Sequence, residues 1–517
     1  MLLLVASVVA LLVGPALSRV AGQRRAPLAM VDGFIIAALL GIVGLEVLPE
    51  ALEHGGVAAV AAAIVGVALP RLLEGRLHVA EGQLHGAVTW GAVLAYSLHA
   101  TLDGAALVGS SSTVGALGLG VVLHRVPVGV TMWWLVRPRH GVRGAATAVA
   151  VIGAATALGY FGAGRLVTAL PLATIGTFQA LVGGSLLHVV AGHGHGDDVA
   201  PDHPRWSAVG ALLGLASLAM VVHAEGGAHS HGTLAILSFA QTAAPWTFAA
   251  TLLLAFAPRA FSLLAALRRR FGPWLGPLHV GPLLLSFGLF GSRWAALRFA
   301  LAVSAVVVTS RIGHKSAPDD DAEESSASRG LTSIGEGFAG QLMLGAVCAG
   351  LVHAGLGEVS LPHPAWAFVA GAAAWAVPLS GVAAGMAAFA LQPVAPAAAL
   401  VLSIVAPLGT RAVMRRAELR VGARATLIAV SIGALTTTLL GALAATLMPT
   451  WLAPVEGAPV LGRELASVGA FCMGAALVLL ALKLFRAGPR AIVAAVVEPD
   501  AATPHAHEHE HGHEHAH

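Results

Sequence analysis

The sequence predicts an all-α, polytopic integral membrane protein, built as a bundle of roughly 14 to 16 transmembrane helices. Two observations predict this fold class. Hydrophobic residues make up 57% of the 517 residues and charged residues only 11%, whereas roughly a quarter of a soluble domain is charged. Apolar runs of about 20 residues, the helical length that crosses a hydrocarbon layer of ~30 Å, recur along almost the whole chain.

The first apolar run is interpreted as a retained helix, not a cleaved signal, because no positive residue precedes it and a second span follows almost at once. Several runs of the second half are rich in proline and glycine. Because these residues interrupt helices, the predicted number of crossings is a range. The predicted spans are 2–18, 30–49, 56–70, 87–109, 114–136, 145–163, 170–191 and 206–223, then 234–256, 282–309, 333–356, 364–412, 426–448 and 464–484.

The arginines indicate how the chain is oriented in the membrane. They follow the first, third and fifth predicted spans, and the intervening linkers are nearly free of them. Since positive loops stay on the cytoplasmic side, we expect a protein of the cytoplasmic (inner) membrane with its N-terminus outside and its C-terminal tail in the cytoplasm. The basic linkers carry Arg19, Arg24 and Arg25, then Arg71 and Arg76, then Arg137, Arg139 and Arg143.

The chain divides into two predicted membrane domains and a tail. Residues 1–225 hold eight crossings, and residues 233–490 form a second membrane domain that contains an acidic, serine-rich cytoplasmic loop at 312–330. Residues 491–517 are predicted to be a disordered cytoplasmic tail, which ends in HAHEHEHGHEHAH with seven histidines at alternate positions. Such a tract binds zinc, nickel or copper weakly at interchangeable sites; a merely solubilising tail is the alternative.

Ionisable residues inside the predicted spans point to function, because each costs at least ~2.5 kcal/mol at the bilayer centre unless it is paired, solvated or bound to a metal. His99 and Asp103 stand four residues apart in the span 87–109, so both project to one side of a helix. Imidazole and carboxylate together suit zinc and similar divalent ions. The two cysteines, Cys348 and Cys472, lie in apolar spans and imply neither a disulfide nor a cysteine-based zinc site.

Two more spans offer a polar residue beside a proline. His124 precedes Pro127 in HRVPVG, residues 124–129, and Glu46 and Glu50 flank Pro49 in LEVLPEALE, residues 45–53. Proline cannot donate a backbone hydrogen bond, so it frees a carbonyl about one turn earlier and loosens the helix where a ligand could bind.

These segments, together with HATLDG at 99–104, resemble the ZIP family of divalent-metal transporters. That family has an eight-helix fold with both termini outside, and related H-N-x-P-E-G and H-x-x-P-E-G motifs on its fourth and fifth helices line the metal site. The resemblance implies a metal site formed by His99, Asp103 and His124, with Glu46 or Glu50 and His188 as additional ligands. It also implies that Zn²⁺ or another divalent metal is the substrate.

Four departures from the family pattern in the two motifs concern side chains that could bind metal. Ala100 stands for asparagine, Asp103 for glutamate, Arg125 for a polar or acidic ligand, and Val128 for the second glutamate. We therefore expect one metal position and not two. An alternative stays open, in which Arg125 is a fixed cation that forms an ion pair with Asp103 inside a non-transporting relative.

The second half contains a weak internal repeat, with broken apolar regions at 276–300 and 375–416. Broken helices in corresponding positions of two repeats are a sequence sign of a transporter's midplane site. This half resembles the predicted permeases that include organoarsenical efflux proteins, chiefly in the second copy. The Cys-Ser-Cys type motif of that family is absent, so its thiol chemistry is not carried over.

The expected function is the transport of divalent metal cations, zinc first, across the membrane. The alternatives are a permease for another solute and a membrane protein that binds or senses metal without transporting it. The sequence has no P-loop of the G-x-x-x-x-G-K-[ST] kind, so transport would be driven by gradients or by capture of the metal after it has crossed. No nucleophile or general base accompanies the ligands, and we expect neither an enzyme nor an organic cofactor. The expected partners are the metal and the lipid bilayer but no nucleic acid, and a homodimer is an open alternative.

Overall fold

The structure is a computed structural model that describes residues 1–21, 25–74, 81–109, 116–166, 171–192, 203–224, 230–256, 274–275, 278, 280–312, 331–357, 359–453 and 464–497. Within these residues the secondary structure is helical and contains no strand. This confirms the predicted all-α class.

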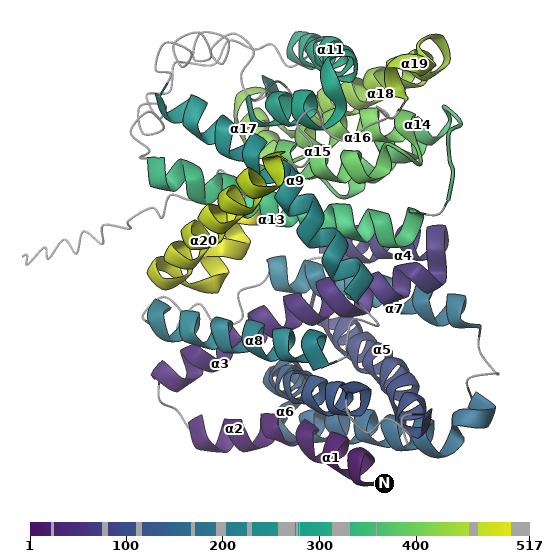
Figure 1. The fold of residues 1–517 in the computed structure, drawn as a ribbon, viewed down its shortest axis with the longest axis vertical. Coiled ribbons are helices and arrows are strands. Elements are labelled where there is room, and N and C mark those ends of the chain that lie inside the picture. The colour runs from purple at the N-terminus through teal and green to yellow at the C-terminus, as the bar shows by residue number, and fades with distance from the viewer. Residues whose placement is uncertain are drawn as a thin grey trace, which may run out of the picture.

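The helices of the N-terminal half occupy the lower part of Figure 1 and those of the C-terminal half the upper part. The first half contains α1 (Leu2–Leu11), α2 (Val13–Ala21), α3 (Arg25–Ile42), the π-helix η1 (Val43–Val47), α4 (Leu48–Glu74), α5 (Glu81–Gly109), α6 (Ala116–Leu166), α7 (Leu172–Gly192) and α8 (Pro204–Ala224). The second half contains α9 (Ser230–Phe256), α11 (Val280–Ile312), α13 (Leu331–Leu356), α14 (Trp366–Ala376), α15 (Gly381–Leu391), α16 (Pro396–Leu408), α17 (Arg411–Val421), α18 (Ala423–Leu447), α19 (Pro449–Leu452) and α20 (Glu464–Val497).

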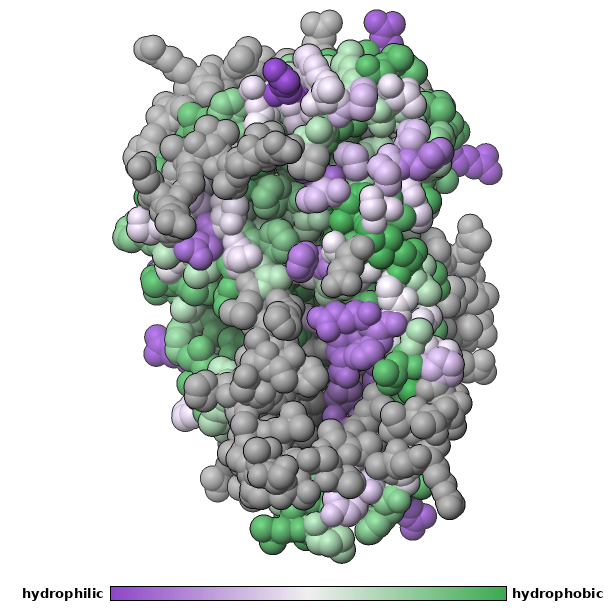
Figure 2. All heavy atoms as spheres, turned by 45° about the vertical axis from the view of Figure 1, so that its right-hand side comes forward, coloured by the Kyte–Doolittle hydropathy of each residue, from purple (hydrophilic) through white to green (hydrophobic). Residues whose placement is uncertain are grey.

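The protein is a multi-pass membrane protein by the length and composition of its helices. Eight helical stretches in the described part of the chain are long and apolar enough to cross a bilayer. Large hydrophobic side chains such as Leu213, Leu439 and Phe471 are exposed on the outer helices, and hydrophobic residues lie open over much of the described surface in Figure 2. A surface of this kind is suited to lipid and would be unusual in water. The predicted total of roughly 14 to 16 crossings stays a prediction.

Prolines and glycines explain where helix boundaries differ from the prediction. The span predicted at 2–18 is two helices, α1 and α2, because Pro15 has no N–H to donate and a continuous helix would lose a bond there. The spans predicted at 30–49 and 56–70 lie in the run α3, η1 and α4, which is interrupted at Gly56. The run predicted as a span at 364–412 consists of three short helices, α14, α15 and α16, and the breaks before α15 and α16 lie within the region 375–416 that was predicted to be broken.

The two largest hydrophobic clusters in the described part of the chain lie one in each half. The first is built on residues from Leu11 to Leu218 and the second on residues from Ile236 to Ala476. Leu45 and Val60 pack against both clusters, so the segment of η1 and α4 touches the second half, where it meets α13. The helix that carries part of the candidate site is therefore also the helix that joins the halves.

The C-terminal helix α20 makes a second connection between the halves (Figure 1). Residues 491–497, predicted as the start of a disordered tail, are helical. The helix breaks at Gly488, whose φ of 80° suits a residue without a Cβ, and Pro489 then starts the next turn. Beyond the break, Arg490 Nη2 donates to Asp32 Oδ1 on α3 at 2.6 Å. Asp32 thus holds the last helix against the first half.

The Asp32–Arg490 pair should have a modest effect on stability. Both side chains are about a quarter exposed, so we expect a coupling energy of about 1 kcal/mol or less. A double-mutant cycle with Asp32→Asn and Arg490→Met, followed by unfolding in detergent, measures it. The matched control is Arg486→Met, because Arg486 lies on the same helix, is far more exposed and contacts Glu336 at 3.6 Å. If the effects of the two substitutions on the free energy of unfolding are simply additive, Asp32 and Arg490 do not stabilise the protein through their ion pair.

Candidate metal site

Glu50 is placed by an irregular stretch of helix at the start of α4. Pro49 has no N–H, so the carbonyl one turn earlier lacks its usual donor, and residues 43–47 widen into the π-helix η1. The N–H of Leu48 donates to the carbonyl of Val43, five residues back. Glu50 follows in the first turn of α4, with its side chain 21% exposed.

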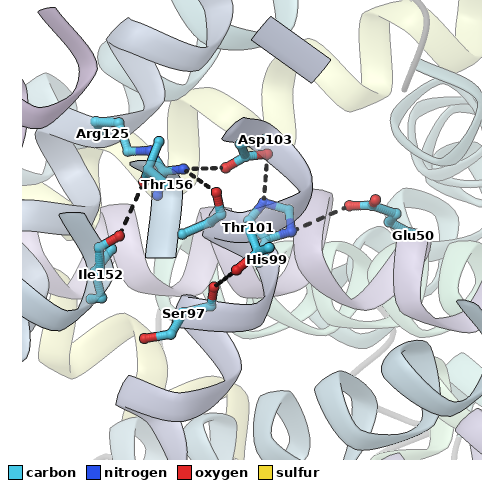
Figure 3. A network of polar contacts seen from close by, with 9 residues as sticks. Glu50, Ser97, His99, Thr101, Asp103, Arg125, Ile152 and Thr156 are labelled. Carbon is cyan, nitrogen blue, oxygen red and sulfur yellow. Dashed lines mark hydrogen bonds and ion pairs between the residues drawn. The ribbon is translucent and has the colours of Figure 1, made fainter. Parts of the chain in front are cut away.

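His99 and Asp103 occupy one side of α5, as their spacing predicts (Figure 3). The His99 ring lies between two carboxylates from different helices: its Nδ1 is 3.6 Å from Glu50 Oε2 and its Nε2 is 3.7 Å from Asp103 Oδ1. The side chain of His99 is 6% exposed and that of Asp103 is 16% exposed. The structure therefore gathers three of the predicted residues, Glu50, His99 and Asp103, around one imidazole.

Arg125 reaches this group from α6. Its Nη2 donates to Asp103 Oδ2 at 2.7 Å and lies 3.5 Å from the carbonyl oxygen of Ala100, while its side chain is 1% exposed. The ion pair between Arg125 and Asp103, which the sequence left as an alternative, is thus confirmed. A buried guanidinium now occupies the place where the resemblance expects a second metal-binding group.

The other motif departures have equally simple explanations. Val128 is 1% exposed and Ala100 is fully buried, and both belong to the hydrophobic cluster of the first half. The hydroxyls of Ser97 and Thr101 donate to carbonyls one turn earlier on α5, at 2.7 and 2.9 Å. None of these four residues is ionisable, and the ionisable side chains that the structure describes in this group are Glu50, His99, Asp103 and Arg125.

The charges of the group are unbalanced when the imidazole is neutral. Arg125 offsets the charge of Asp103, and Glu50 then keeps a negative charge beside a buried ring. In a low-dielectric interior such a charge favours a cation close to it. Binding of a metal ion would supply that cation.

The two nitrogens of His99 face different carboxylates. Asp103, already fixed by Arg125, lies 3.7 Å from Nε2, and Glu50 lies 3.6 Å from Nδ1. A carboxylate that orients the far nitrogen of an imidazole is the usual companion of a metal-bound histidine. Glu50 is also the most exposed of the three acidic and imidazole groups, so an ion would reach the ring from its side.

The described residues do not by themselves complete a metal site. No group of three His, Cys, Asp or Glu side chains in the part of the chain that the structure describes is arranged to hold an ion. Glu46 lies in η1, His124 in α6 and His188 in α7, but their side chains lie outside the described ones. Their role as ligands stays a prediction.

No family model, no curated protein and no solved structure matches the chain. The metal hypothesis therefore rests on the residues of the chain itself and on the motifs quoted above.

Proposed function

We propose that the first half transports a divalent metal ion, with zinc as the first candidate, across the cytoplasmic membrane. The observation that carries the proposal is the position of His99, a buried imidazole held between Glu50 of α4 and Asp103 of α5. An imidazole with carboxylates from two helices has the donor chemistry that zinc takes in proteins. Ionisable groups buried in a membrane domain are themselves a sign of a solute pathway.

Each side chain has a separate role in this proposal. Glu50, partly exposed, receives the ion and offsets part of its charge as water is shed. His99 binds through Nδ1, and Asp103 orients the ring from the other side. Arg125 fixes Asp103 and so limits the site to one ion. With the N-terminus outside, the ion would pass from outside to the cytoplasm, down its own gradient.

Radioactive zinc uptake into proteoliposomes tests this function. His99→Ala and Glu50→Gln are each expected to lower uptake at least tenfold, because each removes a ligand from a site with few of them. Glu53→Gln is the matched control: it lies on the same helix one turn away, is exposed, and should transport as the unchanged protein does. The His-rich tail is common to all variants and cancels from the comparison.

A metal-binding protein that does not transport is the second candidate, and the Arg125–Asp103 ion pair favours it. A fixed guanidinium beside the site limits the number of bound ions. It can also prevent a bound ion from passing further through the protein. In that case zinc would raise the melting temperature of the unchanged protein but not that of His99→Ala. Neither the unchanged protein nor any variant would take up zinc. Uptake that survives both His99→Ala and Glu50→Gln would refute the site under either candidate.

A further inference from the structure

Arg298, in α11 of the second half, is a fully buried cation with too few partners. It is 0% exposed, and its Nη2 donates to the carbonyl oxygen of Ser403 on α16 at 3.0 Å. Nε and Nη1 have no hydrogen-bond partner in the described part of the chain. No carboxylate there lies within ion-pair distance of it, in contrast to Arg125. A buried charge of this kind is costly unless something neutralises it.

A second buried donor lies one helical turn away. Trp294 is 1% exposed, and its indole N–H has no acceptor among the described residues. Its ring stacks on Phe290, with centroids 3.7 Å apart and planes 9° from parallel. Because residues four apart share one side of a helix, Trp294 and Arg298 present their donors on the same side of α11. Donors without acceptors, one of them charged, are what an anion requires.

The surroundings of Arg298 are those of a solute site in a permease-like domain. Arg298 lies near the middle of the apolar stretch Gly281–Arg311, and α11 breaks at Gly291, where φ is 81° and ψ is 175°. The helices α15 and α16, which contact α11, and α14, which packs against α16, have only 11, 13 and 11 residues, too few to cross a bilayer. Irregular backbone at membrane depth occurs where it is buried in protein or lines a solute path.

Glu336, an acidic residue of the second half, does not supply the missing partner of Arg298. Glu336 on α13 lies 3.6 Å from Arg486 of α20, and it makes no contact with Arg298 in the described structure. The missing negative charge has therefore to come from outside the described chain.

We propose that the second half binds an anionic solute, a carboxylate or an oxyanion, through the Arg298 guanidinium and the Trp294 indole N–H, between α11 and α16. This site is separate from the metal site in the first half and does not depend on the proposed metal transport. Metal uptake and anion binding can each fail without the other.

The test uses the full chain, purified in neutral detergent without anionic lipid, and three probes: acetate, inorganic phosphate and sulfate, each at constant ionic strength against chloride. A ligand that binds only the folded state raises the melting temperature as its concentration passes Kd. We expect at least one probe to do so for the unchanged protein. Arg298→Met should abolish the shift, and Trp294→Phe, which keeps the stacked ring but removes the N–H, should weaken binding about tenfold.

The matched control is Arg293→Met, on the same helix but exposed, which should leave the shift unchanged. If Arg298→Met does not fold, Trp294→Phe decides the question alone. No shift with any probe, or an equal shift in Trp294→Phe and the unchanged protein, would overturn the proposal. An Arg298-dependent shift seen only with added phosphatidylglycerol would also overturn it, since the ligand would then be a lipid headgroup and not a solute.

Discussion

Replacing Arg125 by methionine is expected to lower the free energy of unfolding by about 3–5 kcal/mol, because it leaves the carboxylate of Asp103 without its partner in a largely buried place. The guanidinium is 1% exposed and donates at 2.7 Å, so little water can replace it. Asp103 keeps 16% exposure, which puts the expected loss toward the lower end. Equilibrium unfolding of the detergent-solubilised protein, without added metal, measures it.

The same substitution should strengthen metal binding. Without Arg125, Asp103 Oδ2 loses the guanidinium from which it accepts, and a divalent ion can take over the neutralising role of the guanidinium. Zinc should therefore raise the melting temperature of Arg125→Met by more than it raises that of the unchanged protein.

The double variant Arg125→Met with Asp103→Asn is the control for this prediction. It removes both charges, so it should recover most of the lost stability without the additional response to zinc. A zinc response of Arg125→Met no larger than that of the unchanged protein would show that Arg125 does not occupy a metal position.

The elements that sequence predicted well are those set by local chemistry. Long apolar runs predict helices because only a helix satisfies its own backbone in lipid, and the crowding of proline and glycine at 375–416 predicts the breaks before α15 and α16. Where boundaries were wrong, a local cause acted together with a distant contact. The helix at 491–497 is an example: Pro489 starts its turn, but Arg490 finds Asp32 458 residues away, which no local pattern indicates.

The candidate site shows the same limit. The spacing of His99 and Asp103 predicts their shared side of a helix, and the replacement of a ligand by Arg125 predicts an ion pair. The approach of Glu50 to the other face of the ring depends on how α4 packs, which spacing does not contain. Arg298 could have been found from the sequence, because it lies inside the predicted span 282–309. The rule that an ionisable residue inside an apolar span indicates function applies there too, but only the first half was considered in this way.

Gly104→Ala should disrupt the site without changing any ionisable group. Gly104 follows Asp103 on α5, and a Cβ there would lie 2.1 Å from the carbonyl oxygen of Thr156 on α6. The contact is reciprocal, because a Cβ at Gly159 would lie 1.9 Å from the carbonyl oxygen of Thr101. Small residues that let two backbones touch are the usual basis of helix packing in membranes. Neither carbonyl can move without its helix, so alanine must push α5 and α6 apart.

We expect Gly104→Ala to cost about 3 kcal/mol of stability, the upper part of the range for overpacked interiors, and to weaken zinc binding at least tenfold, because a shift of α5 changes the position of His99 relative to Glu50 of α4. Gly91→Ala is the matched control, on the same helix with nothing within 4 Å of the added Cβ. It should be neutral or stabilising by up to about 1 kcal/mol, since alanine favours helix more than glycine does. Equal melting temperatures and zinc responses for the two variants would mean that the contact of α5 with α6 does not position the site.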